Sequence, residues 1–264
     1  MYTFKQERLK FGGIKMTIIK FTDTMGVPEE YRPKPADRFV PDWYKNLESY
    51  LGGEKKPDGN GGTTGTAKRC MPIFDAIVGG YILSTYVDVW VKQVPQIPEG
   101  THVDENTDMS QFPTQPFYEW PSFGPIQFHP LEQAPQHPGK GAHKISYPKW
   151  INPWAITTPP GYSVLFVQPL HRESMFTILP GIVDTDQYKA AVNFPFVLNE
   201  ADKFEGLIPA GTPMAQVIPF KRDAWEMELG TMEDFNEQAR VTSKLRTKFF
   251  DSYKTQYRQV KEYK

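Results

Sequence analysis

Prolines recur along the chain from Pro28 to Pro219, and they limit what it can fold into more than any other feature. The 264 residues include 25 prolines and 20 glycines. Proline lacks a backbone donor and clashes inside a helix, and glycine weakens a helix through its backbone entropy. Both residue types are common where strands end and turns begin. The sequence therefore excludes a helical bundle and predicts short strands joined by many turns.

The pattern is most regular between Trp150 and Trp225. Strand-sized segments alternate there with Pro, Gly, Asp and Asn: WAITTP, YSVLFVQP, MFTILPGIVD, AAVNFPFVL, FEGLIPAG and PMAQVIPF. Such spacing is typical of an antiparallel barrel or sandwich. Upstream, the run YILSTYVDVWV predicts one continuous strand in which Asp88 faces solvent or is hydrogen-bonded. We predict a mainly β fold with a barrel-like antiparallel sheet, in a single domain over residues 16–230.

Two segments of this domain differ from the strand pattern. Residues 52–68 are polar and glycine-rich and predict a flexible loop. Residues 95–150 hold ten prolines together with many aromatic residues. This segment is too rich in proline for core strands. We expect it to form a long ordered loop, here called an excursion, that packs on the sheet or on a neighbouring subunit. Residues 1–15 are interpreted as an upstream extension, because Met16 begins a better β pattern.

The last segment, residues 231–264, predicts a C-terminal amphipathic α-helix. Thr231 and Asp234 have the spacing of a capping box, and apolar residues then follow at steps near three and four. Eight Lys and Arg against five Asp and Glu give this segment a net charge of +3. So small an excess favours packing against the sheet or a partner helix over nucleic-acid binding.

The net charge and the cysteine content indicate which partners and which cellular compartment to expect for this protein. The formal net charge is −1, which gives no drive toward nucleic acid or an anionic membrane. Cys70 is the single cysteine, so an intramolecular disulfide is excluded and a reducing, cytoplasmic location is expected. No apolar run approaches the length of a membrane span, and we expect no membrane association.

Three stretches resemble an uncharacterised family of tailed phages, cyanophages among them, and of some bacteria. They are KRCMPIFDAIVGGYILSTYVDVWV, LPGIVDTDQY with the later VNFPFVLN, and IPAGTPMAQVIPFKRDAW. The resemblance implies no known activity. It suggests a phage origin, which would place the protein in the host cytoplasm or in the virion.

A second, local resemblance covers residues 157–220. TTPPGYSVLFVQP, GIVDTDQY and IPAGTPMAQVIPF are similar to motifs of the trimeric dUTP pyrophosphatases and dCTP deaminases, in the same order. The resemblance implies a β-clip fold and a homotrimer. It also implies that Asp184 orients and deprotonates a water near a magnesium-bound triphosphate, and that Tyr188 packs against the deoxyribose. Where that family has Pro-Arg-Ser for phosphate contacts, this chain has Pro169-Leu170-His171-Arg172, and the family's glycine-rich C-terminal arm is absent.

These departures make a non-enzymatic binding or assembly protein, homo-oligomeric, our leading hypothesis. The alternative is a nucleotide or phosphate hydrolase that uses Mg²⁺. Its candidate residues are Asp184, Asp186, Tyr188, Arg172 and His171. For the aspartate pair, the competing interpretation is a turn whose short carboxylates accept backbone hydrogen bonds.

A third hypothesis is a non-haem iron oxygenase. His102 and Asp104 have the His-x-Asp spacing of a facial triad, and the third ligand would be one of the other four histidines: His129, His137, His143 or His171. The competing interpretation is a solvated histidine in a polar, turn-rich loop.

Overall fold

The computed structural model is mainly β, as predicted. It describes residues 17–57, 63–121, 124–134, 136, 146–201, 203–247 and 253–264. Within these residues, fourteen strands form four antiparallel sheets, and none of the sheets closes into a barrel. The expected extension over residues 1–15 lies outside the described residues.

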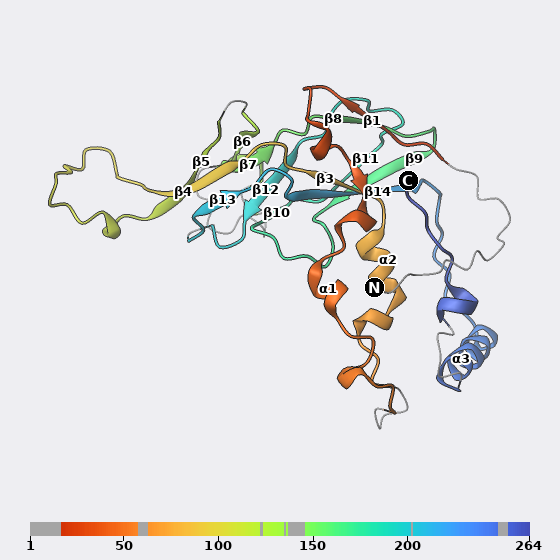
Figure 1. Ribbon diagram of the computed structural model, residues 1–264. Helices are drawn as coiled ribbons and strands as arrows, with labels where there is room; N and C mark the ends of the chain where they lie inside the picture. Colours follow the sequence, from red (N-terminus) through yellow and green to blue (C-terminus); the bar gives the residue numbers. More distant parts are fainter. Residues whose placement is uncertain are drawn as a thin grey trace.

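A five-stranded sheet is central to the molecule (Figure 1). In spatial order its strands are β11 (Gly181–Val183), β9 (Tyr162–Val167), β14 (Pro213–Lys221), β3 (Tyr81–Ser84) and β2 (Lys34–Pro35). β14, the longest strand, pairs with β9 on one side and with β3 on the other. The buried residues of this sheet include Ile82, Val164, Phe166 and Val217, which are β-branched or aromatic, the types that pack well on a pleated surface.

The second large sheet has four strands and carries most of the aromatic core. Its strands are β10 (Phe176–Ile178), β12 (Phe194–Leu198), β7 (Ser146–Trp150) and β6 (Ile126–Pro130). The ring of Phe196 stacks on that of Trp150, with centroids 5.0 Å apart, and meets that of Phe176 edge to face at 5.5 Å. All three side chains are buried, which offsets the modest apolar content of the chain.

Two smaller sheets complete the β structure. One contains β13 (Gly206–Ile208), β4 (Val89–Pro95) and β5 (Thr114–Glu119). The other pairs β1 (Lys20–Asp23) with β8 (Trp154–Thr157). In Figure 1, β4 and β5 lead into a long loop that projects to the left of the sheets.

The run from Tyr81 to Val91 is two strands, not the one strand that its composition predicts. Thr85 separates them, because its side chain donates to the carbonyl oxygen of Pro209 at 2.8 Å and its backbone N–H to that of Thr212 at 2.9 Å. β3 and β4 therefore join different sheets. Asp88 accepts a hydrogen bond from the backbone N–H of Ala210 at 2.7 Å. It is therefore hydrogen-bonded, which is one of the two environments expected for it from the sequence.

The proline-rich segment 95–150 contains core strands, contrary to expectation. β7 ends in the buried Trp150 and lies between β12 and β6. It tolerates Pro148 because β12 pairs only with Lys149 and Trp150, so the missing N–H of proline costs no hydrogen bond on that side. Among the described residues, the part between β4 and β5 contains no strand and is an excursion.

The short helices α1 (Asp42–Asn46) and α2 (Met71–Val78) lie beneath the sheets in Figure 1. Along the chain there are also 3-10 turns at Glu29–Tyr31, Ala36–Phe39, Leu51–Gly53, Ala67–Arg69, Met109–Gln111 and Leu131–Gln133. The described parts of the loop over residues 52–68 are held by bridges between Tyr50 and Gly65 and between Pro57 and Thr63. None of the described helices is long and apolar enough to span a membrane.

The C-terminal segment is helical only in part. α3 (Met232–Thr247) begins with the expected capping box, in which the Asp234 carboxylate accepts from the Thr231 backbone N–H at 2.6 Å. A π-helical turn follows at Tyr253–Tyr257, and residues 258–264 are not helical. The prediction of a helix reaching residue 264 is wrong there, because the tail packs back onto α2 and β3.

Candidate functional site: the aspartate pair and the C-terminal arm

The central sheet brings Asp184, Asp186 and Arg222 together. Asp184 follows β11 directly and Arg222 follows β14 directly. Both strands pair with β9, where Val164 is opposite both Val183 and Pro219. Residues that follow β11 and β14 therefore meet at the same end of β9.

Asp186 is a buried carboxylate that is held on three sides. Arg222 approaches it with two nitrogens, Nη1 at 2.8 Å from Oδ1 and Nη2 in a short contact with Oδ2. The backbone N–H of Gly161 donates to Oδ2 at 2.9 Å. The side chain is 2% exposed. The hydrogen bond from Arg222, followed by that from Gly161, holds the pKa of Asp186 far below its ordinary value, so the group stays ionised.

Asp184 lies beside this pair but is 60% exposed. Its Oδ1 accepts from the hydroxyl of buried Ser163 at 2.6 Å and lies 3.1 Å from Nη1 of Arg222. Its backbone carbonyl accepts from the N–H of Tyr188 at 2.8 Å, which forms a turn and leaves the Tyr188 side chain half exposed.

These contacts agree with the turn interpretation of the aspartate pair. The guanidinium of Arg222 lies between the two carboxylates, where a magnesium ion bridging them would have to bind. A cation already in that place leaves no room for a second positive charge. The residues present therefore do not fit the magnesium that a hydrolase would need, and the pair acts as an anchor for Arg222.

His171 and Arg172 lie at the opposite end of β9. The backbone N–H of Leu170 donates to Oε1 of Gln216, whose strand partner is Val167, the last residue of β9. The two ends of a six-residue strand are about 16 Å apart. One chain alone therefore does not bring Arg172 next to Asp184. Nε and Nη2 of Arg172 are buried without a hydrogen-bond partner, and burial lowers the pKa of this guanidinium.

His102 and Asp104 lie in the exposed loop between β4 and β5. Asp104 caps a turn there, since its Oδ1 accepts from the backbone N–H of Asn106 at 3.0 Å and the hydroxyl of Thr107 at 2.9 Å. In the part of the chain that the structure describes, no three His, Cys, Asp or Glu residues gather as a metal site would require. His137 and His143 lie outside that part. The donor set around His102 does not fit an iron centre.

Arg222 is the site residue that sequence reasoning missed. Its partner Asp186 precedes it by 36 residues, and no local motif links the two. The available signal was its position directly after the predicted strand PMAQVIPF, which places it beside the ends of the neighbouring strands.

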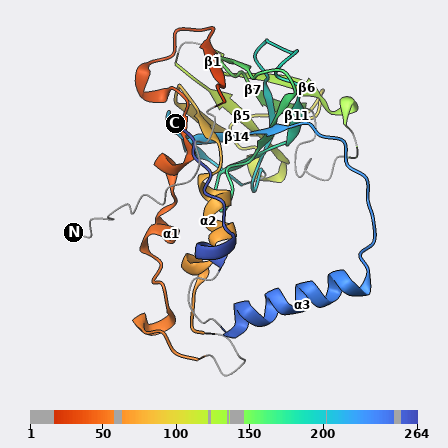
Figure 2. The ribbon, with the colours of Figure 1, turned by 90° about the vertical axis from the view of Figure 1, so that its right-hand side faces the viewer.

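Residues 222–247 form what we call the C-terminal arm, which leaves β14 and carries α3 away from the sheets (Figure 2). Residues 222–230 are extended and exposed. Five large apolar side chains in the arm are between 61% and 89% exposed: Trp225, Met227, Leu229, Met232 and Phe235. We call this set the apolar stripe.

A second anchor holds the chain after the arm. Arg258 pairs with Asp75 of α2 at 2.5 Å, with both side chains nearly buried, and Lys261 approaches the same carboxylate at 2.9 Å. The Tyr263 ring packs edge to face on Tyr81 of β3, 5.8 Å between centroids. Burial alone would raise the pKa of Asp75, but the hydrogen bonds from Arg258 and Lys261 outweigh it and lower the pKa. One Arg–Asp pair thus holds the first residue of the arm, and a second holds the chain at Arg258, eleven residues after the arm ends.

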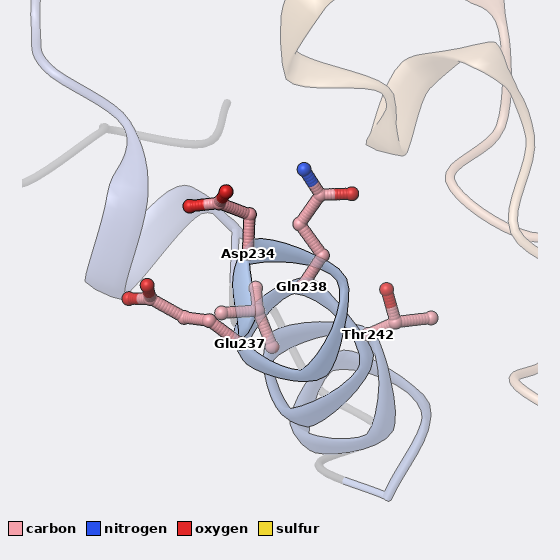
Figure 3. A pocket seen from close by; sticks show the side chains of 5 residues that line it. Asp234, Glu237, Gln238 and Thr242 are labelled. Atoms are coloured by element: carbon pink, nitrogen blue, oxygen red, sulfur yellow. The ribbon is translucent and has the colours of Figure 1, made fainter. Parts of the chain in front are cut away.

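Among the described residues, the walls of a pocket on α3 come from this helix (Figure 3): Asp234, Glu237, Gln238, Val241 and Thr242. Their spacing places them on one side of the helix, away from Met232. No other described element contributes a wall, so we assign no ligand to this pocket.

The chain matches no protein-family model, no curated protein and no solved structure. The geometry described above therefore carries the functional conclusion.

Proposed function

We propose that this chain is a non-enzymatic assembly protein that forms homo-oligomers through its C-terminal arm. The observation that carries the proposal is the apolar stripe, which the chain leaves in solvent although its core is rich in aromatic residues. A tailed-phage origin, as the sequence resemblance suggests, would fit such a role.

The area of the apolar stripe supports a protein–protein contact. A large buried aromatic side chain contributes roughly 150–250 Å². Five large side chains at the observed exposures therefore present on the order of 600–800 Å². Monomeric proteins rarely expose more than a few hundred Å² of continuous apolar surface, and a standard interface buries about 800 Å² per partner.

The state of the aspartates supports a non-enzymatic role. Asp186 is buried against Arg222, and Ser163, which donates to Asp184, is fully buried. Neither group is placed to meet a substrate. Arg172, which a phosphate-handling site would need nearby, lies at the far end of β9.

Size-exclusion chromatography with light scattering tests the proposal. We expect the full chain at micromolar concentration to elute with a mass that is a multiple of 30.3 kDa. A single species of 30.3 kDa at the highest attainable concentration would overturn the assembly function.

The hydrolase remains the second candidate, because Asp184 keeps an exposed carboxylate. Its test is turnover of a panel of nucleoside triphosphates with Mg²⁺, with Asp184→Asn as the matched control. Turnover by the unchanged chain that the Asp184→Asn variant loses would replace our proposal with an enzymatic one.

A further inference from the structure

We propose that the arms of two copies pair antiparallel, so that the acidic half of each arm lies against the basic half of the other. This inference rests on the assembly function proposed above and names its interface. The occupant of the apolar stripe is then a second copy of the same chain.

The charge distribution along the arm is divided into two halves. Residues 223–238 contain six acidic residues and no Lys or Arg: Asp223, Glu226, Glu228, Glu233, Asp234 and Glu237. Residues 239–247 contain Arg240, Lys244 and Arg246 and no acidic residue. A parallel pair would place like charges together. An antiparallel pair related by a two-fold axis places opposite charges together at both ends.

The helix dipole accounts for only part of this division. Glu233 and Asp234 lie in the first turn of α3, where negative charge is favourable on any helix. Asp223, Glu226 and Glu228 precede the helix and gain nothing from its dipole. Glu226 and Glu228 alternate with three members of the apolar stripe in the sequence Trp-Glu-Met-Glu-Leu, so an extended segment presents an apolar side and an acidic side.

The lengths of the two parts of the arm also match. The nine extended residues 222–230 span about 30 Å at the rise of a strand. The sixteen residues of α3 span about 24 Å. The extended segment of one copy can therefore run along most of the helix of the other.

The two anchors use none of the residues of the proposed contact. Arg222 and Arg258 both pair with aspartates of the body, one at the first residue of the arm and one beyond its last residue. In Figures 1 and 2, α3 lies away from all four sheets. The described side chains of α3 are exposed except that of Val241, which is partly buried.

Charge reversal in separate halves tests the pairing. One variant carries Glu226→Lys, Glu228→Lys and Glu237→Lys, which leaves residues 223–238 with three Lys against three acidic residues and no net charge. A second carries Arg240→Glu, Lys244→Glu and Arg246→Glu, which makes it acidic throughout. Each variant alone should self-associate at least about tenfold more weakly than the unchanged chain in sedimentation velocity, because the first loses the attraction between the two halves and the second places acidic residues against each other. An equimolar mixture of the two should regain association as a mixed dimer.

The matched control reverses three exposed charges far from the arm, with Glu99→Lys, Glu105→Lys and Glu132→Lys. It should associate like the unchanged chain. Circular dichroism shows whether each variant keeps its fold. If the unchanged chain associates but the mixture of arm variants does not, antiparallel pairing is overturned and the assembly function stands. If the unchanged chain is monomeric, the assembly function itself fails.

Discussion

Phe196 gives the sharpest test of the packing that holds the β body together. Its side chain is fully buried in β12, and its ring contacts three others, those of Trp150, Phe176 and Tyr118. Truncation of a buried phenylalanine to alanine costs about 3–5 kcal/mol through lost transfer energy and the cavity left behind. Ring pairs add about 0.5–1.5 kcal/mol each beyond buried area. We therefore expect Phe196→Ala to lower the free energy of unfolding by about 4–5 kcal/mol, at the upper end of that range.

Phe128→Ala is the matched control, because it removes the same side chain from the same sheet. Phe128 is 50% exposed, and its ring contacts that of Tyr118 with centroids 5.9 Å apart. Half of a phenylalanine burial is worth about 1–2 kcal/mol. Urea unfolding followed by far-ultraviolet circular dichroism measures both variants. If the losses in free energy of unfolding for Phe196→Ala and Phe128→Ala differ by less than about 1 kcal/mol, the aromatic cluster does not stabilise the β sheets as described.

Three further predictions concern single groups. Gly80→Ala should destabilise the protein by more than about 3 kcal/mol in the same urea titration, since the added Cβ would lie 2.0 Å from a backbone carbonyl oxygen of β14. Gly26 has nearly the same positive φ but lies in open space, so Gly26→Ala should lower the free energy of unfolding by only about 1–2 kcal/mol. Gln216→Leu should lower the free energy of unfolding by about 3 kcal/mol or more in differential scanning calorimetry. The change leaves three backbone groups without their partner: the N–H of Leu170 and the carbonyls of Ala76 and Gly79. An unchanged free energy of unfolding would show that these hydrogen bonds do not stabilise the fold. Asp75 and Asp186 have lowered pKa values in the folded state. The stability that they contribute is therefore present above the unfolded pKa of about 4 and is lost as the pH falls through the folded pKa values. The thermal unfolding midpoint should stay level from about pH 7 to 5 and decline below about pH 4, and a decline already at about pH 6 would contradict the role of the two anchors.

Most strands from Trp154 to Lys221 could be predicted from the sequence, because turn residues flank them on both sides. The segment MFTILPGIVD, which reads as one strand, forms two, β10 and β11, and these join different sheets. The break in the run from Tyr81 to Val91 could not. It depends on a hydrogen bond that Thr85 donates to Pro209 and one that Asp88 accepts from Ala210, both across more than 120 positions. Likewise, the strands β6 and β7 were hidden by prolines that the local pairing pattern tolerates.

The candidate site shows the same limit. Local motifs single out Asp184 and Asp186, and the turn that begins at Asp184 is one of the two interpretations that the sequence allows. Their partner Arg222 could be found only from the register of three strands. The docking of Arg258 on Asp75 joins residues 183 positions apart, and no periodicity in the helical segment indicates it.

The two Arg–Asp anchors make the arm a closed loop and not a free tail. A free tail can thread through a neighbouring molecule and exchange places with its equivalent, which ties separation to unfolding. A loop tied at both ends can only lie alongside another. Two copies joined in this way can come apart with each body intact, so subunits should exchange between assemblies faster than the chains unfold.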